Sequence, residues 1–285
     1  MNVTIQSLHS YPLKSAGGVP LASAEMGITG LPSDRRWMLV DDEGRFVSQR
    51  RVSEMARLSV AMELEGMTVR HPDQEPLFIG TDAVVGDVFE ANMHRADEHL
   101  KVCSAGATAA DWFTECFRET GIGGLRLVRL IDQFARRIPD RPEEVRQRMF
   151  LSDGYPFLIA SDASLELLNQ QLGSTTNGQL EMNRFRPNIV IGGPGPWMEM
   201  KTGLVLEDET GAIRLRLVKP CQRCTIPQVN PNTGQRDVPS DLHRLLKQLD
   251  HHRDVPINCF GQNAILEAGA GRTLSVGQSL RLVDG

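Results

Sequence analysis

Short alternations of apolar and polar residues dominate the first ~110 residues of the chain and predict β-strands rather than helices. Residues 36–40 and 45–49 flank the turn-forming tetrapeptide Asp-Asp-Glu-Gly at 41–44, and this arrangement predicts a hairpin. Further strands are expected at residues 57–63, 67–70 and 76–79. Closely spaced short strands of this kind favour a small barrel or a sandwich.

The pattern changes within residues 105–125, where apolar residues recur at helical spacing. Residues 107–120 predict a helix, and Gly121 is a natural end for it. The apolar face of this helix carries Trp112, Phe113, Cys116 and Phe117. The chain is therefore β-rich first and mixed α and β afterwards, and a boundary between two parts is expected in this region.

Apolar strands and amphipathic helices alternate in the second half of the chain. Strands are expected at residues 125–130, 156–160 and 187–191. Helices with leucines at helical spacing are expected from Ser161 to Gly173 and after Ser240. Residues 273–283 alternate as one closing strand, with Gly277 at a bend.

The composition indicates a soluble globular protein. The chain has 285 residues, of which 40% are hydrophobic and 24% charged, enough for one large or two ordinary domains. A net charge of −5 argues against a general nucleic-acid binder, and no segment approaches the ~20 apolar residues of a membrane span. Residues 1–10 lack the layout of a secretory signal, and five cysteines do not suggest a disulfide framework. A reducing cytoplasm is the expected compartment.

The sequence Lys-Pro-Cys-Gln-Arg-Cys-Thr-Ile at residues 219–226 carries the strongest candidate chemistry. It follows residues 211–217, which alternate apolar and charged side chains as a half-buried strand does. Cys221 and Cys224 are therefore expected where a strand gives way to a loop, a common location for functional residues. A thiolate there suits a soft-ligand metal such as zinc, copper or an iron–sulfur cluster.

Spacing alone leaves several roles open for these two cysteines. Structural zinc usually needs four ligands, and the chain has no second Cys-x-x-Cys pair. A mixed zinc site would draw on His243, His251 and His252. A thioredoxin-like redox pair is disfavoured, because the motif does not open a helix after a strand. Two small thiols packed in a loop are the simplest alternative.

Fragments along nearly the whole chain resemble motifs of the molybdenum-dependent amidoxime-reducing component family. The fragment at 219–234 resembles the signature of the MOSC domain, the molybdenum-cofactor sulfurase C-terminal fold. Similar fragments lie at residues 11–15, 34–37, 152–156, 184–190 and 260–262. Because these fragments occur in the order of the family, the chain is identified as a member of it.

The resemblance implies a β-rich α+β fold in two parts. Residues 1–115 would form a MOSC N-terminal β-barrel domain, and residues 116–285 a MOSC domain, which is a mixed β-barrel with flanking helices. The molybdenum cofactor, in its molybdopterin form, would lie between them. The chain lacks the cysteine spacing of a fused ferredoxin domain and the length for a pyridoxal-phosphate desulfurase domain.

The resemblance also implies the residues of the site. Cys224 corresponds to the thiolate ligand of molybdenum and is the expected catalytic and metal-binding residue, whereas Cys221 does not correspond to the ligand. The remaining expected cofactor-binding residues are Lys14, Ser15, Arg35, Asp153 and Arg186. Cations suit the phosphate of the pterin, and a soft thiolate suits a metal that sulfur already binds.

Each of these cations has an ordinary alternative role at the surface. Lysines are mostly solvated, and Lys14 would then be an exposed charge. Arg35 lies next to another arginine, and only one of the two is expected to turn inward. Arg184 and Arg186 are spaced as same-face neighbours on a strand, which is also compatible with plain exposure.

The activity that the resemblance implies is the reduction of N-hydroxylated compounds, namely amidoximes, hydroxylamines and N-hydroxylated base analogues. The cofactor would remove the oxygen, and a separate flavin or iron–sulfur protein would deliver electrons. No nucleic-acid or membrane partner is expected. Two alternatives use the same residues: a sulfur carrier that holds a persulfide on Cys224, and a molybdopterin-binding module without turnover.

Overall fold

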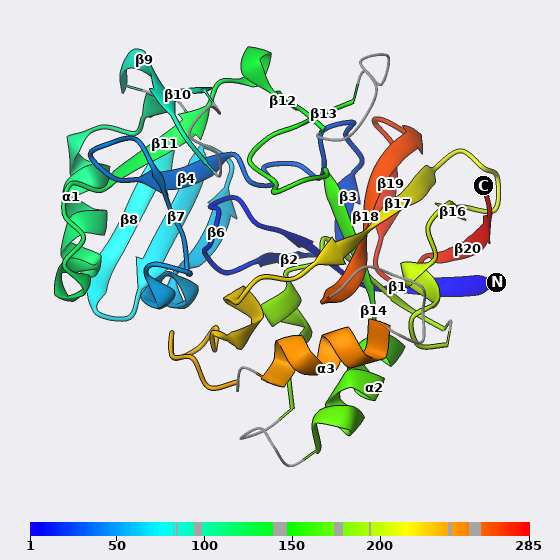
Figure 1. Ribbon diagram of the computed structural model, residues 1–285. Coiled ribbons are helices and arrows are strands. Elements are labelled where there is room, and N and C mark those ends of the chain that lie inside the picture. Colours follow the sequence, from blue (N-terminus) through cyan, green and yellow to red (C-terminus); the bar gives the residue numbers. More distant parts are fainter. Residues whose placement is uncertain are drawn as a thin grey trace.

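The computed structural model shows two β-rich halves that lie side by side, with two helices below the second half (Figure 1). It describes residues 1–81, 83, 85–93, 99–138, 147–173, 179–193, 195–238, 241–250 and 258–285. The β-rich α+β fold expected from the sequence is confirmed. Every helix in these described segments is too short or too polar to span a lipid bilayer.

A closed mixed barrel forms the second half. Going round the barrel, its strands are β1 (Asn2–Ser10), β20 (Ser279–Asp284), β16 (Leu204–Glu207), β17 (Arg214–Gln222), β18 (Cys259–Ala268), β14 (Phe157–Ser161) and β15 (Ile189–Gly192). The ring closes because β15 pairs with β1; β14 and β15 are parallel, and the other neighbours are antiparallel. Alternate side chains such as Ile5, Leu215 and Leu282 fill its core.

Two helices cover one side of the barrel, α2 (Asp162–Leu172) and α3 (Asp241–Asp250). Leu168, Leu246 and the stacked rings of Phe185 and Phe260 bury the contact between them and the barrel wall. Short 3-10 turns at Met182–Phe185, Met198–Met200 and Ile226–Gln228 complete this layer.

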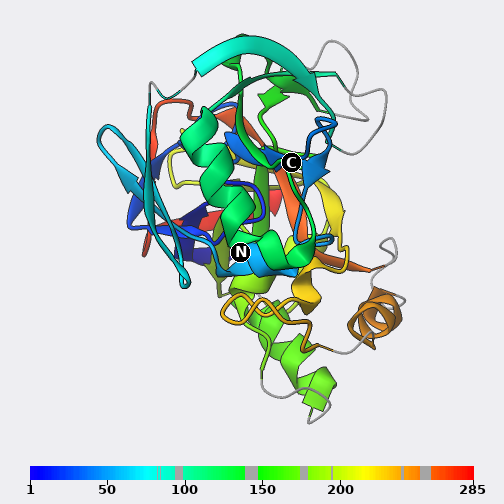
Figure 2. The ribbon, with the colours of Figure 1, turned by 90° about the vertical axis from the view of Figure 1, so that its left-hand side faces the viewer.

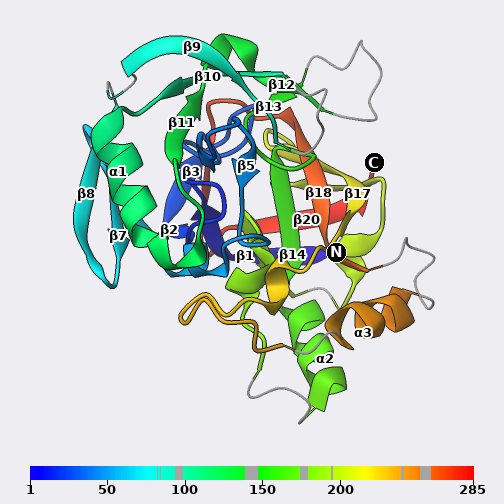
Figure 3. The same cartoon turned by 60° about the vertical axis from the view of Figure 1, so that its left-hand side comes forward.

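The first half combines two sheets and one helix. One sheet has the order β5 (Phe46–Val47), β4 (Trp37–Val40), β11 (Arg126–Leu130), β10 (Leu100–Ser104), β9 (Val85–Ala91). The other has the order β6 (Ser59–Glu63), β7 (Gly66–His71), β8 (Gln74–Gly80). Helix α1 (Ala107–Cys116) packs on β8 and β11 (Figures 2 and 3), and its Phe113 lies fully buried among residues of both sheets.

Smaller elements join these parts. They are β2 (Val19–Leu21) beside β1, β3 (Ser23–Glu25) paired with β19 (Thr273–Ser275), β12 (Arg136–Arg137) paired with β13 (Arg148–Met149), and 3-10 turns at Ser53–Arg57, Arg118–Thr120 and Asp132–Phe134.

Most elements expected from the sequence are present. The hairpin is confirmed, since β4 and β5 pair antiparallel around residues 41–45. The expected helix at 107–120 ends as an α-helix at Cys116 and continues as a 3-10 turn to Gly121, which has a left-handed φ of 72°. Helix α3 begins at Asp241, whereas the expected cap Ser240 lies outside the described residues.

Two strand predictions are corrected by the structure. Residues 273–283 do not form one strand, because Gly277, at φ 83°, turns the chain between β19 and β20. Strand β17 begins later than expected, at Arg214, and runs on through Cys221 to Gln222. Only the second cysteine of the motif therefore lies beyond the strand.

The two halves draw strands from distant parts of the chain. Strand β1, at the N-terminus, is part of the barrel built otherwise from residues after 156. Strand β11, at Arg126–Leu130, is part of the sheet that contains β4. The expected division of the chain between residues 115 and 116 stays a prediction.

Candidate cofactor site

Tyr11 ties together three segments at the junction of the two halves. It directly follows β1 and is almost fully buried. Its backbone N–H donates to Asp34 Oδ1 at 2.8 Å, and its hydroxyl donates to the carbonyl of Pro187 at 3.1 Å. The turn after it is fixed by a hydrogen bond from Lys14 N–H to the Trp37 carbonyl at 2.8 Å.

Two of the predicted arginines lie over the ring of Tyr11. The guanidinium carbons of Arg35 and Arg186 are 4.6 and 4.4 Å from the ring centre. Arg35 donates to Asp34, to Asn188 Oδ1 at 3.2 Å and to the Arg186 carbonyl at 3.1 Å, while Arg186 donates to the Ala16 carbonyl. Both residues have left-handed backbones, with φ of 48° and 56°, which turn their side chains toward Tyr11.

Lys14 is the third predicted cation and is also buried. Its Nζ donates to the Leu151 carbonyl at 2.7 Å and to Asp153 Oδ1, and it lies 5.1 Å from the ring centre of Phe46. The side chain of Asp153 is 64% exposed, against 8% for Lys14. Asp153 is thus an exposed counter-ion of Lys14 in this structure.

Burial shifts the pKa values of these groups. It lowers the pKa of Arg186 to about 10, and no carboxylate hydrogen-bonds that guanidinium among the described residues. Burial also lowers the pKa of Lys14, although Asp153 opposes the shift. For Arg35 burial acts in the same direction, but the Asp34 carboxylate outweighs it and the pKa is raised. Burial raises the pKa of Tyr11 to about 12.

These groups leave an excess of positive charge. Three cations, the buried Lys14 and the half-buried Arg35 and Arg186, face two carboxylates, Asp34 and Asp153. A buried charge without a counter-ion is unfavourable, so the cluster is suited to bind an anion. We refer to Tyr11, Lys14, Arg35 and Arg186 as the cation cluster.

Ser15 is held in place through its backbone carbonyl. The residue is buried and has a left-handed φ of 70°. Its carbonyl accepts a hydrogen bond from Gln49 Nε2 at 2.6 Å. Gln49 was not anticipated from the sequence, because no local pattern distinguishes it from the other residues of the hairpin.

The two cysteines of the motif differ in their contacts. Cys221 Sγ, in β17, accepts a hydrogen bond from Arg223 Nη1 at 3.0 Å, and Arg223 Nη2 donates to the Phe185 carbonyl at 2.8 Å. Cys224 is half-buried, and no described residue forms a hydrogen bond with its sulfur. Its carbonyl, like that of Arg223, lies 3.1 Å from His243 Nε2 on α3. All five cysteines are described, and none is in a disulfide.

Arg236 connects the loop at residues 223–237, which we call the cysteine loop, with the first half of the molecule. Arg236 donates to the Thr225 carbonyl at 3.3 Å and to the carbonyls of Gln49 and Arg50 at 3.4 and 3.3 Å. Gln49 also donates to the Ser15 carbonyl, so Arg236 and Gln49 connect this loop with the segment that follows Lys14. Arg236, like Gln49, lies outside every motif found in the sequence.

The alternative interpretation of Arg184 and Arg186 as same-face neighbours on a strand is wrong. Arg184 belongs to the 3-10 turn at Met182–Phe185, and Arg186 follows that turn in the left-handed conformation. Arg184 points to Asp237, with Nη–Oδ distances of 2.9 and 3.1 Å, whereas Arg186 points to Tyr11. Because Arg186 adopts the left-handed conformation directly after the turn, its side chain points away from that of Arg184.

A mixed zinc site finds no support in the described part of the chain. No group of three or more His, Cys, Asp and Glu side chains in that part is arranged to hold a metal ion. His243 instead contacts two backbone carbonyls. His251 and His252, the other two histidines of such a site, lie outside the described residues.

Comparison with known families identifies the class of protein. The MOSC N-terminal beta barrel domain matches residues 2–120, and the MOSC domain matches residues 146–281. Together these matches span most of the chain, and the chain belongs to the MOSC-domain proteins that carry both parts.

Similar proteins are found over nearly the full length. The chain is 29% identical over 293 residues to mitochondrial amidoxime-reducing component 1 of Mus musculus, covering 98% of this chain and 82% of that protein. It is 28% identical over 298 residues to the protein of that name from Homo sapiens, covering 98% and 83%. It is also 28% identical over 234 residues to molybdenum cofactor sulfurase of Drosophila grimshawi, covering 79% of this chain and 28% of that protein. The family resemblance expected from the motifs is confirmed.

Proposed function

We propose that the chain binds a molybdenum cofactor beside the cation cluster and reduces N-hydroxylated compounds. The family match and the names of its relatives support a link to this cofactor. The bound cofactor supplies the two electrons that, with two protons, convert an N–OH group to N–H and water. A separate flavin or iron–sulfur protein is the proposed source of those electrons.

The residues of the site fit the cofactor chemically. Lys14, Arg35 and Arg186 would bind the phosphate of the pterin, because phosphate accepts charge-assisted hydrogen bonds and the cluster lacks one counter-ion. Cys224 would supply a thiolate ligand to the metal, since no described group hydrogen-bonds its sulfur. Ser15 and Asp153 would line the same site.

The observation that carries the proposal is the half-buried guanidinium of Arg186. It stacks on Tyr11, receives no carboxylate in the described structure, and has a pKa lowered to about 10. Such a charge is retained at a cost in stability, and an anionic ligand is the simplest reason for it. Its neighbour Arg35 donates to the Arg186 carbonyl, which also fixes the turn that presents it.

Metal analysis of protein from a cofactor-producing host tests the binding step. About one molybdenum per chain is expected in the wild type, and Cys224→Ser should lower it at least ~tenfold, as loss of a ligand does at metal sites. The matched control is Cys221→Ser, which should keep the metal, because Cys221 is engaged by Arg223.

Turnover of benzamidoxime with a supplied electron source tests the reaction. Conversion to benzamidine by the loaded wild type is the expected result. Fully loaded protein without turnover would contradict the reductase and favour a binding module. Protein without molybdenum that releases sulfur as thiocyanate on cyanide treatment would favour the sulfur carrier. The cytoplasmic compartment stays a prediction, since the relatives are named as mitochondrial proteins.

A further inference from the structure

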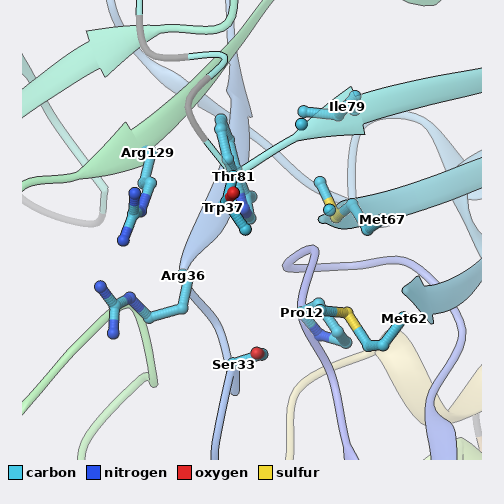
Figure 4. Close-up of a pocket in the computed structure, with 11 residues that line it drawn as sticks. Pro12, Ser33, Arg36, Trp37, Met62, Met67, Ile79, Thr81 and Arg129 are labelled. Carbon is cyan, nitrogen blue, oxygen red and sulfur yellow. The ribbon is translucent and has the colours of Figure 1, made fainter. Parts of the chain in front are cut away.

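A pocket in the first half of the molecule combines two guanidinium groups with an apolar wall. It has a volume of about 140 Å³ and opens between β4 and β11 on one side and β6 to β8 on the other. Figure 4 shows Arg36 and Arg129 on one side and Met62, Met67 and Ile79 on the other, with Trp37 and Thr81 between them.

The pocket is separate from the cation cluster, although the two share a stretch of backbone. Arg35 turns toward Tyr11, whereas the next residue, Arg36, lines the pocket and directs its guanidinium toward Asp132 and Phe150, on the side of the pocket away from the methionines. Arg129 is placed by the pairing of β11 with β4, in which it lies opposite Trp37. A hydrogen bond from Leu130 N–H to the Arg36 carbonyl, at 3.2 Å, fixes the same junction.

The two guanidinium groups share one carboxylate oxygen. Arg36 and Arg129 both contact Asp132 Oδ1, the second at 3.5 Å, and the side chain of Asp132 is 62% exposed. One face of the Arg36 guanidinium is covered by the Phe150 ring at 3.8 Å. Arg36 Nε is buried and has no hydrogen-bond acceptor in the described part of the protein. Two guanidinium groups therefore share one carboxylate, and the pair retains positive charge for a second anion.

The opposite wall of the pocket suits a ligand with an apolar body. Met67 and Ile79 are almost completely buried at the edge of the core, and Met62 is 40% exposed. Thioether and aliphatic side chains such as these pack against aromatic or aliphatic groups. A cavity of ~150 Å³ holds one benzene molecule, so a pocket of about 140 Å³ suits a body the size of a single ring.

We propose that this pocket binds a small organic carboxylate whose apolar body has about the size of one ring. Guanidinium groups match the two oxygens of a carboxylate, and the apolar wall excludes water from the rest of the ligand. Inorganic phosphate would use the same donors but would leave the apolar wall uncovered. The proposal does not depend on the cofactor or on the proposed reaction.

Calorimetric titration of the full chain with benzoate tests the proposal. Saturable binding of one benzoate per chain is expected, with benzamide binding at least ~tenfold more weakly, the loss that one charge-assisted hydrogen bond causes. Inorganic phosphate, which the cation cluster is also suited to bind, should not displace benzoate at an equal concentration. Arg129→Gln should weaken benzoate binding about tenfold for the same reason. Asp132→Asn should strengthen it a few-fold, because it removes a competing negative charge.

Two matched variants separate this pocket from other cations. Arg118→Gln removes an exposed arginine that pairs with Glu115, and Arg186→Gln removes a cation of the cluster; both should leave benzoate binding unchanged. Absence of saturable benzoate binding, equal binding of benzamide, displacement of benzoate by an equal concentration of phosphate, or loss of benzoate binding in Arg186→Gln would overturn the proposal. Asp132→Asn keeps the test decisive if Arg129→Gln fails to fold, since weaker binding in that variant would also overturn it.

Discussion

Arg184 and Arg186 lie two residues apart, the first buried and the second half-buried, yet only the first is paired with a carboxylate. Arg184 makes a bidentate contact with Asp237, whose own Oδ2 also accepts from Asn230 Nδ2 at 2.6 Å. Burial alone would raise the pKa of Asp237, but Arg184 and Asn230 outweigh it and the pKa is lowered. Arg186 has only carbonyl and ring contacts in the described structure.

The contrast shows that pairing, rather than burial, separates an arginine that stabilises the fold from one that is suited to a ligand. A bidentate carboxylate neutralises Arg184 and fastens the cysteine loop to the turn at Met182–Phe185. The charge of Arg186, which no carboxylate neutralises, lowers the stability of the fold unless an anion binds to it. The two residues therefore predict opposite effects on stability and on ligand binding.

Substitution of Arg184 should have the largest effect on stability. Arg184→Gln leaves Asp237, whose side chain is 29% exposed, without its bidentate partner, and loss of such charge-assisted hydrogen bonds lowers the free energy of unfolding by about 2 kcal/mol. Urea unfolding measures the change. Arg184→Lys should not restore it, because an ammonium cannot make the two parallel bonds.

The matched variant Arg186→Gln should change the free energy of unfolding by less than about 1 kcal/mol in protein without cofactor. It removes a half-buried charge that no carboxylate contacts in the described structure, along with one hydrogen bond to the Ala16 carbonyl, and these effects oppose each other. Equal destabilisation by the two substitutions would show that the distinction drawn from pairing is mistaken.

Anion binding should show the reverse order. Inorganic pyrophosphate should raise the unfolding temperature of cofactor-free wild type, since a ligand at about 100 times its Kd adds about 2.7 kcal/mol of stability. The gain should largely vanish in Arg186→Gln and persist in Arg118→Gln, a surface arginine paired with Glu115. A gain that persists in Arg186→Gln would mean that the anion binds elsewhere.

The sequence predicted much of this arrangement because several signals are local. The hairpin of β4 and β5 follows from a four-residue turn between apolar stretches, and helix α1 follows from its spacing and from Gly121. Cys224, Lys14 and Arg186 lie in motifs that can be recognised within a few residues. The family resemblance predicts that these motifs form one site.

The parts that the sequence did not reveal depend on distant partners. Arg184 pairs with Asp237, 53 residues away, and no local pattern indicates that contact. Arg236 reaches carbonyls about 187 residues away, at Gln49 and Arg50, so its role follows only from the folded chain. Residues 273–283 alternate throughout, but β19 pairs with β3 near the N-terminus while β20 enters the barrel.

The pH dependence of stability should sharpen the comparison further. The pKa of Arg186 is about 10 when folded and returns to its ordinary, higher value on unfolding, so above about pH 10 the unfolded chain binds more protons. The wild type should therefore gain stability relative to Arg186→Gln, by about 1 kcal/mol, as pH rises from about 9 to about 11.

Urea midpoints of the two proteins across this range measure that difference. Tyr11, with a pKa raised to about 12, stays protonated in the folded state of both proteins, so the difference reports mainly on Arg186. A wild-type curve that runs parallel to the variant curve would show that Arg186 is already neutralised. Saturating pyrophosphate should flatten the difference, because the bound anion raises the pKa of Arg186 again.

The smallest effect is expected at His243, the residue of α3 that contacts the cysteine loop. Its Nε2 lies 3.1 Å from the carbonyls of both Arg223 and Cys224, which requires a proton on that nitrogen. His243→Ala should lower the free energy of unfolding by about 1 kcal/mol and speed amide exchange at residues 223–225. His243→Gln keeps a nitrogen donor and should recover most of both. Equal exchange rates in His243→Ala and His243→Gln would show that the imidazole ring acts by packing and not through its hydrogen bond. The cysteine loop would then be held by Arg184 and Arg236.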